Sequence, residues 1–205
     1  MSCRMLMDSN TLMHWTYRRC LPRLQQMDGD YSVATFVEDV RAATADARGE
    51  AALVERAKPL LLRLAQTSSW MRPQLYECDA EQGFGVTVLH EEPDHGLWLV
   101  AVCWLPGCGA PPHNHGTWAV VAGVNGEEEN TVWRRRCGGL EAQGAYTIRP
   151  GQTAGFLSNA IHSVVNKGQR TTLSLHVYGR NLNFVERSRY DPRTGAETPF
   201  KLQVQ

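Results

Sequence analysis

From Trp70 onward the chain consists of short apolar or alternating runs separated by Gly, Pro, Asn and Asp. Short strands at this spacing, with turn residues between them, are typical of an antiparallel β-sandwich or barrel. The acidic run Glu127–Glu129 lies between two of these runs and is expected at an exposed hairpin tip. The expected strands are Val86–Glu91, Leu97–Leu105, Thr117–Val124, Thr131–Arg136, Ala145–Ile148, Ala154–Ser158, Thr171–Tyr178 and Phe184–Tyr190.

Two helical segments are expected before the strands. Apolar residues recur at helical spacing from Ser32 to Ala47, and a second helical pattern covers Glu50–Gln66. Pro59 is expected to break the second helix, because proline in a helix interior costs roughly 3 kcal/mol. Residues 1–30 show no clear periodicity and are expected to form a poorly ordered arm. We therefore expect one domain over 31–205, with a helical preface in 31–70 and a mainly β barrel with C-terminal strands in 71–205.

The charge balance and the apolar pattern exclude several classes of protein. Lys+Arg and Asp+Glu both number 21, so neither nucleic acid nor an anionic membrane is expected as the main partner. No apolar run reaches the roughly 20 residues of a membrane span, and the N-terminus lacks the apolar stretch of a secretory signal. The six cysteines have no CxxC spacing and are expected to be reduced. We expect a cytoplasmic protein that is a monomer or a small homo-oligomer.

Three histidines form a candidate metal site. In residues 107–115, strand alternation would place the side chains of His113 and His115 on one face. His162, within residues 150–166, would supply a third imidazole from a later strand. Three imidazoles suit several first-row transition metals, among them Fe, Zn, Ni, Cu and Mn. A His-x-His pair alone is more often an ordinary surface or hydrogen-bonded pair, so the interpretation depends on both segments together.

The two histidine segments resemble the two signature motifs of the cupin superfamily. This resemblance implies a double-stranded β-helix (jelly-roll) barrel that holds a metal. Cupins usually carry a glutamate a few residues after the second histidine, but Ala119 stands at that position, so the resemblance implies a shell of three histidines. Residues 173–179 (Leu-Ser-Leu-His-Val-Tyr-Gly) further resemble the Ser-x-His-x-Tyr strand of the thiol dioxygenases, the family of cysteine dioxygenase and 3-mercaptopropionate dioxygenase. That resemblance covers roughly residues 50–200 and implies Fe(II) as the cofactor.

Four further residues take their expected roles from this resemblance. Strand alternation places Ser174, His176 and Tyr178 on one face, and the resemblance implies that they act as a hydrogen-bonded catalytic chain beside the iron. The alternative is an ordinary barrel strand whose polar face meets water. Arg187 lies nine residues after Tyr178, where the mercaptopropionate enzymes have an arginine that pairs with the substrate carboxylate. Two nearby arginines compete for this role.

Two positions depart from the family pattern. Family members carry Tyr-x-Arg or Tyr-Gln-Arg on an early strand that holds the substrate, whereas residues 84–86 read Phe-Gly-Val. Ala119 replaces the cysteine that animal cysteine dioxygenases cross-link to the tyrosine, so no cross-link can form. The first hypothesis is a non-haem iron thiol dioxygenase that converts a small mercapto-carboxylate (3-mercaptopropionate, cysteine or mercaptosuccinate) and O2 to the sulfinate. The alternatives are a cupin oxygenase or isomerase acting on another small acid, and a non-catalytic metal-binding sensor.

Overall fold

The computed structural model describes residues 31–201, so the predicted arm of residues 1–30 lies outside the described residues. The described chain begins with the helices α1 (Val33–Thr44) and α2 (Glu50–Ala65), followed by the short 3-10 helix η1 (Pro73–Tyr76). The Ser32 hydroxyl accepts a hydrogen bond from the backbone N–H of Thr35 and so caps α1. Within residues 31–201, no helix combines the length and the apolar character that crossing a membrane requires.

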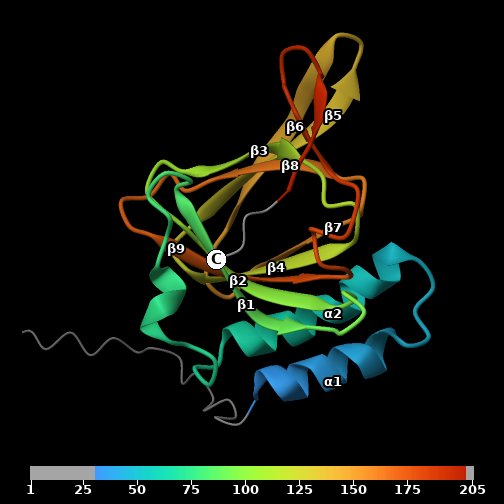
Figure 1. Cartoon of the computed structure of the whole chain (residues 1–205), viewed down its shortest axis with the longest axis vertical. Helices are drawn as coiled ribbons and strands as arrows, with labels where there is room; N and C mark the ends of the chain where they lie inside the picture. The colour runs from blue at the N-terminus through green and yellow to red at the C-terminus, as the bar shows by residue number, and fades with distance from the viewer. Residues whose placement is uncertain (1–30, 202–205) are drawn as a thin grey trace, which may run out of the picture.

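The strands form two antiparallel sheets that face each other (Figure 1). The first sheet has the strand order β1-β2-β9-β4-β7, and the second has the order β11-β10-β3-β8-β5-β6. From β4 to β9 the chain passes repeatedly between the sheets, which is the double-stranded β-helix architecture predicted from the sequence. The sheets do not join into a closed barrel within the described residues. The strands are β1 (Phe84–Glu91), β2 (Trp98–Trp104), β3 (Gly109–His113), β4 (Ala119–Asn125), β5 (Glu128–Arg136), β6 (Gly139–Ile148), β7 (Thr153–Phe156), β8 (Ile161–Val165), β9 (Thr172–Tyr178), β10 (Ser188–Tyr190) and β11 (Glu197–Pro199).

Several of the predicted strand boundaries were wrong. Strands were expected around His113 and around His162, where β3 and β8 lie, but without bounds, and β11 was not expected; two prolines in β3 weaken its strand signal. The predicted strand Phe184–Tyr190 is ordered as a strand only over β10, so Arg187 lies in the preceding loop. β5 begins at Glu128, three residues before the predicted Thr131. The run Glu127–Glu129 is therefore not an exposed tip, because Glu128 lies in the sheet with 3% of its surface exposed.

Pro59 does not break α2, contrary to the prediction. The helix is continuous from Glu50 to Ala65, and the proline lies on its exposed face. The opposite face buries Val54, Ala57 and Leu61 against the first sheet. Burying such side chains stabilises by roughly 1.5–3 kcal/mol for each large apolar residue, which outweighs the local cost of one missing hydrogen bond.

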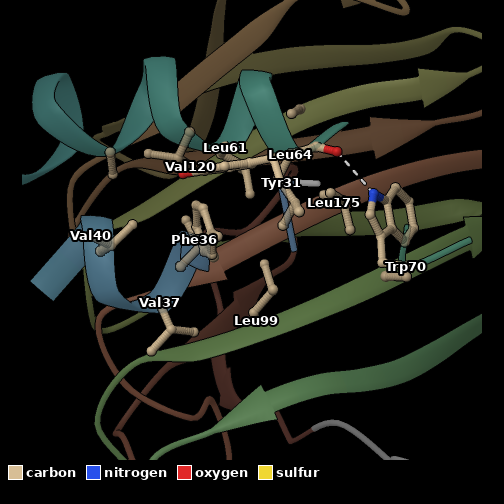
Figure 2. Packing of buried hydrophobic residues seen from close by; sticks show 14 of the residues in the cluster. Tyr31, Phe36, Val37, Val40, Leu61, Leu64, Trp70, Leu99, Val120 and Leu175 are labelled. Carbon is tan, nitrogen blue, oxygen red and sulfur yellow. Dashed lines mark hydrogen bonds between the residues drawn. The ribbon is translucent and has the colours of Figure 1, made fainter. Parts of the chain in front are cut away.

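The first sheet is buried on both faces, which explains why β2 is apolar throughout. Alternate residues such as Leu99 and Ala101 face α1 and α2, and Trp98 and Val100 face the second sheet. Figure 2 shows side chains from both helices meeting this sheet, where Leu61 of α2 lies close to strand residues. The packing between helices and sheet leaves the other face of the sheet to line the interior of the β-sandwich.

Leu61→Ala should reduce the free energy of unfolding by about 2–5 kcal/mol, because the fully buried side chain would leave a cavity between α2 and the sheet. Pro59→Ala, on the exposed face of the same helix, should instead increase it by up to about 3 kcal/mol. Urea denaturation of the two variants and the parent protein measures both effects. A Pro59→Ala variant that is destabilised as much as Leu61→Ala, or more, would contradict this account of α2.

Candidate metal centre

The three predicted histidines lie together in the space between the two sheets. His113 is the last residue of β3, and it pairs across the sheet with His162 of β8. One potential ligand atom from each of His113, His115 and His162 lies within 4.8 Å of the others. All three side chains are buried, with 6%, 2% and 5% of their surface exposed. His113 and His162 come from neighbouring strands of one sheet, so strand pairing fixes the separation of these two residues.

His115 reaches the cluster by a different route from the one predicted. β3 ends at His113, so simple strand alternation does not position His115. The chain turns at Gly116, which has a φ of 66°. A Cβ at that glycine would lie 2.3 Å from the carbonyl oxygen of Glu186, so only glycine fits this turn. The turn directs the His115 ring toward His162, with ring centroids 4.9 Å apart.

Hydrogen bonds on the far side of two rings leave their Nε2 lone pairs free for a metal. The Nδ1–H of His113 donates to the carbonyl of Pro111 over 2.8 Å, and that of His162 donates to Asn130 Oδ1 over 2.9 Å. The Nε2 atoms of His115 and His162 lie 3.1 Å apart, so a proton or a cation is needed between their lone pairs. His115 Nδ1 has no hydrogen-bond partner among the described residues. This donor set fits a transition-metal ion bound by three imidazoles.

The electrostatics of the cluster also suit a metal. Burial lowers the pKa of His113 to about 4 and holds the pKa values of His115 and His162 well below their usual range. The imidazoles are therefore neutral at physiological pH, which is the form that binds metal ions. The cluster contains no carboxylate. Ala119, at the position where cupins usually have a glutamate, lies on β4 opposite Tyr178 of β9.

The histidines open onto a cavity of about 260 Å³ between the sheets. Its wall is mostly apolar, with several polar side chains besides the histidines. Such a combination is typical of sites for small ligands. The apolar wall includes Phe84, Val86, Val100, Val102, Trp104, Val121, Val164, Leu182 and Phe200, and the other polar residues are Gln82, Glu128, Asn130, His176, Tyr178 and Arg187.

Ser174, His176 and Tyr178 form a hydrogen-bonded chain along β9, on the face that lines the cavity. Ser174 Oγ lies 2.9 Å from His176 Nε2, and His176 Nδ1 lies 2.9 Å from the Tyr178 hydroxyl. The Tyr178 ring lies 5.3 Å from that of His115, measured between centroids. Burial raises the pKa of Tyr178 above its usual range and lowers that of His176 to about 3. The phenol is therefore protonated and the imidazole neutral, which suits the predicted handling of a proton.

Arg187 is held beside the histidines by the segment that carries them. Asn114 exchanges two hydrogen bonds with the backbone of Ser188, at 3.1 Å and 2.8 Å, which fixes the neighbouring Arg187. The guanidinium lies 4.3 Å from the ring centroid of Phe200. Only 5% of the surface of Arg187 is exposed, and its Nε and Nη2 find no acceptor among the described residues. Burial lowers the pKa of Arg187 to about 10, so it remains a cation at neutral pH.

The competing arginines do not share this position. Arg180 and Arg189 are both exposed and do not line the cavity. Arg187 is therefore the buried cation of the cavity within residues 31–201. An anionic group that entered the cavity would find two unpaired N–H donors there, in the fork geometry that suits a carboxylate.

Sequence reasoning missed Glu128 and Asn130, which β5 brings to the cavity. Thr172 and Ser174 donate their hydroxyls to the Glu128 carboxylate over 2.9 Å and 3.1 Å. Burial raises the pKa of Glu128 to about 7. Both residues lie in β5 at period-two spacing from Val132, so extending the strand backward past Thr131 could have found them.

The sequence matches no family model. An oxalate oxidase in complex with the substrate analogue glycolate is 19% identical, covering 54% of this chain and 59% of its own, with a TM-score of 0.42. A cupin domain of an XRE-family transcriptional regulator from Enterobacter cloacae is 18% identical, covering 49% and 99%, with a TM-score of 0.39. An uncharacterised double-stranded β-helix protein from Klebsiella pneumoniae is 14% identical, covering 64% and 96%, with a TM-score of 0.44. These similarities identify neither the activity nor the ligands of this chain, which spans about three fifths of the oxalate oxidase chain.

The protein should bind one divalent transition-metal ion per chain, and Asn130→Ala should weaken this binding by roughly 10- to 100-fold. The physical reason is that His162 would lose the acceptor that fixes its ring orientation and tautomer. Competition with a chromophoric chelator measures the dissociation constant. Asn125→Ala is the matched control, because Asn125 is exposed and its side chain donates to the Tyr76 hydroxyl, away from the histidines. The same loss of affinity in both variants would contradict a supporting role for Asn130.

Glu128 should make the metal-free protein less stable as pH rises. Its pKa in the folded state is about 7, higher than the ordinary glutamate value of 4.5. The stabilising contribution of Glu128 is therefore complete below pH 4.5 and lost as pH rises through 7. The total change is about 3 kcal/mol in the free energy of unfolding. Chemical denaturation at pH 4.5 and pH 8 in parent protein and Glu128→Gln isolates this contribution, because the buried histidines contribute equally to both. Identical pH profiles would show that Glu128 does not titrate in this range.

Proposed function

We propose that the chain is a thiol dioxygenase that converts a small mercapto-carboxylate and O2 to the sulfinate, with Fe(II) held by His113, His115 and His162. The observation that carries the proposal is the combination, in one cavity, of three neutral imidazoles, a buried guanidinium whose Nε and Nη2 lack partners in the described part of the chain, and a tyrosine in a hydrogen-bonded chain. In this reaction the thiol sulfur gains two S–O bonds, the O–O bond is cleaved, and sulfur gives up the four electrons that reduce O2. Both oxygen atoms and the thiol hydrogen are retained in the sulfinic acid product.

The donor set supports an anionic sulfur ligand. Fe(II) would supply the O2 chemistry for which side chains alone have no capacity. The neutral imidazoles of His113, His115 and His162 contribute no negative charge, so the site would favour an incoming thiolate over a neutral thiol. The mostly apolar wall would lower the local dielectric constant and so strengthen this preference.

Arg187 would hold the substrate carboxylate. Its Nε and Nη2 lack acceptors within residues 31–201, and leaving such donors buried and unpaired costs free energy that a bound carboxylate would recover. Asn114 fixes the Arg187 loop to the histidine segment, so the carboxylate and the thiol of one small molecule would be held at a set separation. This tethering would reduce the entropic cost of bringing the reacting groups together.

The apolar wall favours a thiol that has one carboxylate and no amino group. Phe84 and Val86 line the cavity where the resembling family places polar substrate-binding side chains. An ammonium or a second carboxylate against this wall would lose its hydration without gaining a partner. We therefore place 3-mercaptopropionate first, ahead of cysteine and mercaptosuccinate.

The apolar wall is also the observation that supports an alternative function. Arg187 could hold the carboxylate of a small acid that has no thiol, and the same cavity could then serve a different cupin oxygenase or isomerase. A metal-binding sensor is the second alternative. The buried chain that ends at Tyr178 supports catalysis over sensing, since a protein that only binds a ligand does not need a relay for protons.

Oxygen uptake by protein loaded anaerobically with Fe(II) tests the proposal. The thiols are 3-mercaptopropionate, cysteine, mercaptosuccinate and cysteamine, and mass spectrometry of the product follows the addition of two oxygen atoms. We expect uptake with 3-mercaptopropionate to exceed that with cysteine, and His113→Ala to lose it together with bound iron. Iron binding without uptake for any thiol would sink the thiol dioxygenase proposal and leave the other cupin activities.

Arg187→Ala should lower kcat/KM for carboxylated thiols by roughly 10- to 100-fold, which corresponds to the loss of a hydrogen bond to a charged group. Cysteamine, which has no carboxylate, should react equally well with the variant and the parent protein. Arg189→Ala is the matched control, because Arg189 is exposed on the next strand. An equal loss for cysteamine would mean that Arg187 stabilises the site and does not recognise a carboxylate.

A further inference from the structure

The hydrogen-bonded chain on β9 does not end at Ser174. Ser174 Oγ lies 2.9 Å from His176 Nε2 and 3.1 Å from Glu128 Oε2, so the serine links the imidazole to a buried carboxyl group. Thr172 donates its hydroxyl to the other carboxyl oxygen over 2.9 Å. The complete chain is Glu128–Ser174–His176–Tyr178, and it joins β5 of the second sheet to β9 of the first.

The protons available in this chain allow two arrangements. His176 is neutral, because burial lowers its pKa to about 3, so its ring carries a single N–H. When Glu128 is ionised it only accepts hydrogen bonds, and Ser174 must donate to it. Ser174 then accepts from His176 Nε2–H. His176 Nδ1 is left with a lone pair, to which Tyr178 donates its O–H.

When Glu128 is protonated, every hydrogen bond in the chain can reverse. The carboxyl O–H donates to Ser174, and Ser174 donates to His176 Nε2. The ring proton of His176 then lies on Nδ1 and is donated to the Tyr178 oxygen. Tyr178 is left with an O–H that is free to be donated into the cavity.

We propose that Glu128 is a positioning residue that sets the direction of this chain, and therefore whether Tyr178 offers its O–H to the cavity or to His176. Glu128 acts through Ser174 and His176 without contacting the reacting atoms. Its effect on turnover rests on the proposed thiol dioxygenase activity, whereas the tautomer of His176 does not depend on it.

The surroundings of Glu128 make both arrangements accessible. Its carboxyl is 3% exposed and forms no ion pair within residues 31–201, unlike its neighbours Glu127 and Glu129, which pair with Arg149 and Lys167. The titratable groups that face it are His176 and Tyr178 on β9 and Cys103 on β2.

Among these groups only Glu128 changes its protonation near neutral pH. Burial raises its pKa to about 7, and the two hydroxyl donors oppose this rise. Burial also raises the pKa values of Cys103 and Tyr178, so both stay protonated, while His176 stays neutral. A single proton on Glu128 therefore decides the direction of the chain.

Nitrogen-15 NMR of the histidine side chains tests the proposal in protein loaded with Zn(II), a diamagnetic ion that does not react with O2. The His176 resonances are assigned by their loss in His176→Gln. In the parent protein we expect the Nδ1–H tautomer at pH 5.5 and the Nε2–H tautomer at pH 8.5. In Glu128→Gln the neutral amide can donate to Ser174, so the Nδ1–H tautomer should persist at both pH values.

Two further variants complete the experiment. Glu127→Gln is the matched control, because Glu127 is an exposed neighbour in the same acidic run and should leave the pH response intact. Ser174→Ala breaks the link between Glu128 and His176 and should abolish the response. A His176 tautomer that is the same at both pH values in the parent protein would overturn the proposal, even if Glu128→Gln failed to fold.

Activity with the preferred thiol gives a second readout in the iron-loaded protein. Glu128→Gln should remove the inflection near pH 7 from the pH profile of kcat and leave KM within about twofold of the parent value. A changed KM with an unaltered His176 tautomer would overturn the proposal, because Glu128 would then contact the substrate directly. If no thiol supports turnover, the proposed function fails, and the NMR titration still decides the role of Glu128.

Discussion

The mutual approach of three buried imidazoles is the constraint on which the rest of the site depends. The Nε2 atoms of His115 and His162 lie 3.1 Å apart in a cavity with mostly apolar walls. Burial lowers the pKa values of both rings and keeps them neutral. An additional proton on each ring therefore cannot relieve the repulsion between the two Nε2 lone pairs. The fold must therefore hold the nitrogens together against their repulsion until a proton or a metal ion lies between them. The cross-strand pair of His113 with His162 and the hydrogen bond to Asn130 provide that rigidity.

Strand β9 connects the stability of the fold to the geometry of the site. Its odd-numbered residues Leu173, Leu175 and Val177 pack in the core beneath the helices, and its even-numbered residues form the hydrogen-bonded chain in the cavity. A register shift of one residue would exchange the two sets and bury Ser174 and His176 among leucines. The apolar contacts with α2 therefore fix the register that aligns the chain, and the double burial of β9 makes that register costly to change.

The sequence was informative wherever apolar residues recur with a period of two or of 3.6, because this spacing indicates which face of a strand or helix is buried. That pattern predicted both helices, the two-sided burial of β2 and the common face of the polar residues on β9. It failed where tertiary contacts override local preference. Pro59 remains in a continuous helix because the opposite face is buried, and His115 is positioned by the turn at Gly116, outside the strand. Glu128 has the same side chain as its neighbours Glu127 and Glu129, and its hydrogen bonds to β9 distinguish it from them.

Arg187 and Glu128 shift the pKa of Tyr178 in opposite directions. The Arg187 cation lowers the pKa of the phenol and the Glu128 carboxylate raises it, although burial has the largest effect. A carboxylate paired with Arg187 would offset the influence of the cation and leave Tyr178 holding its proton more tightly. Protonation of Glu128 removes the negative charge that raises the pKa of Tyr178. In the proposed chain, the same proton also turns the phenol O–H toward the cavity. The cavity therefore combines a fixed positive charge and a carboxyl group of adjustable charge, both of which act on one buried phenol. In the proposed function, recognition of a carboxylate by Arg187 and the proton affinity of Tyr178 would be linked through electrostatics.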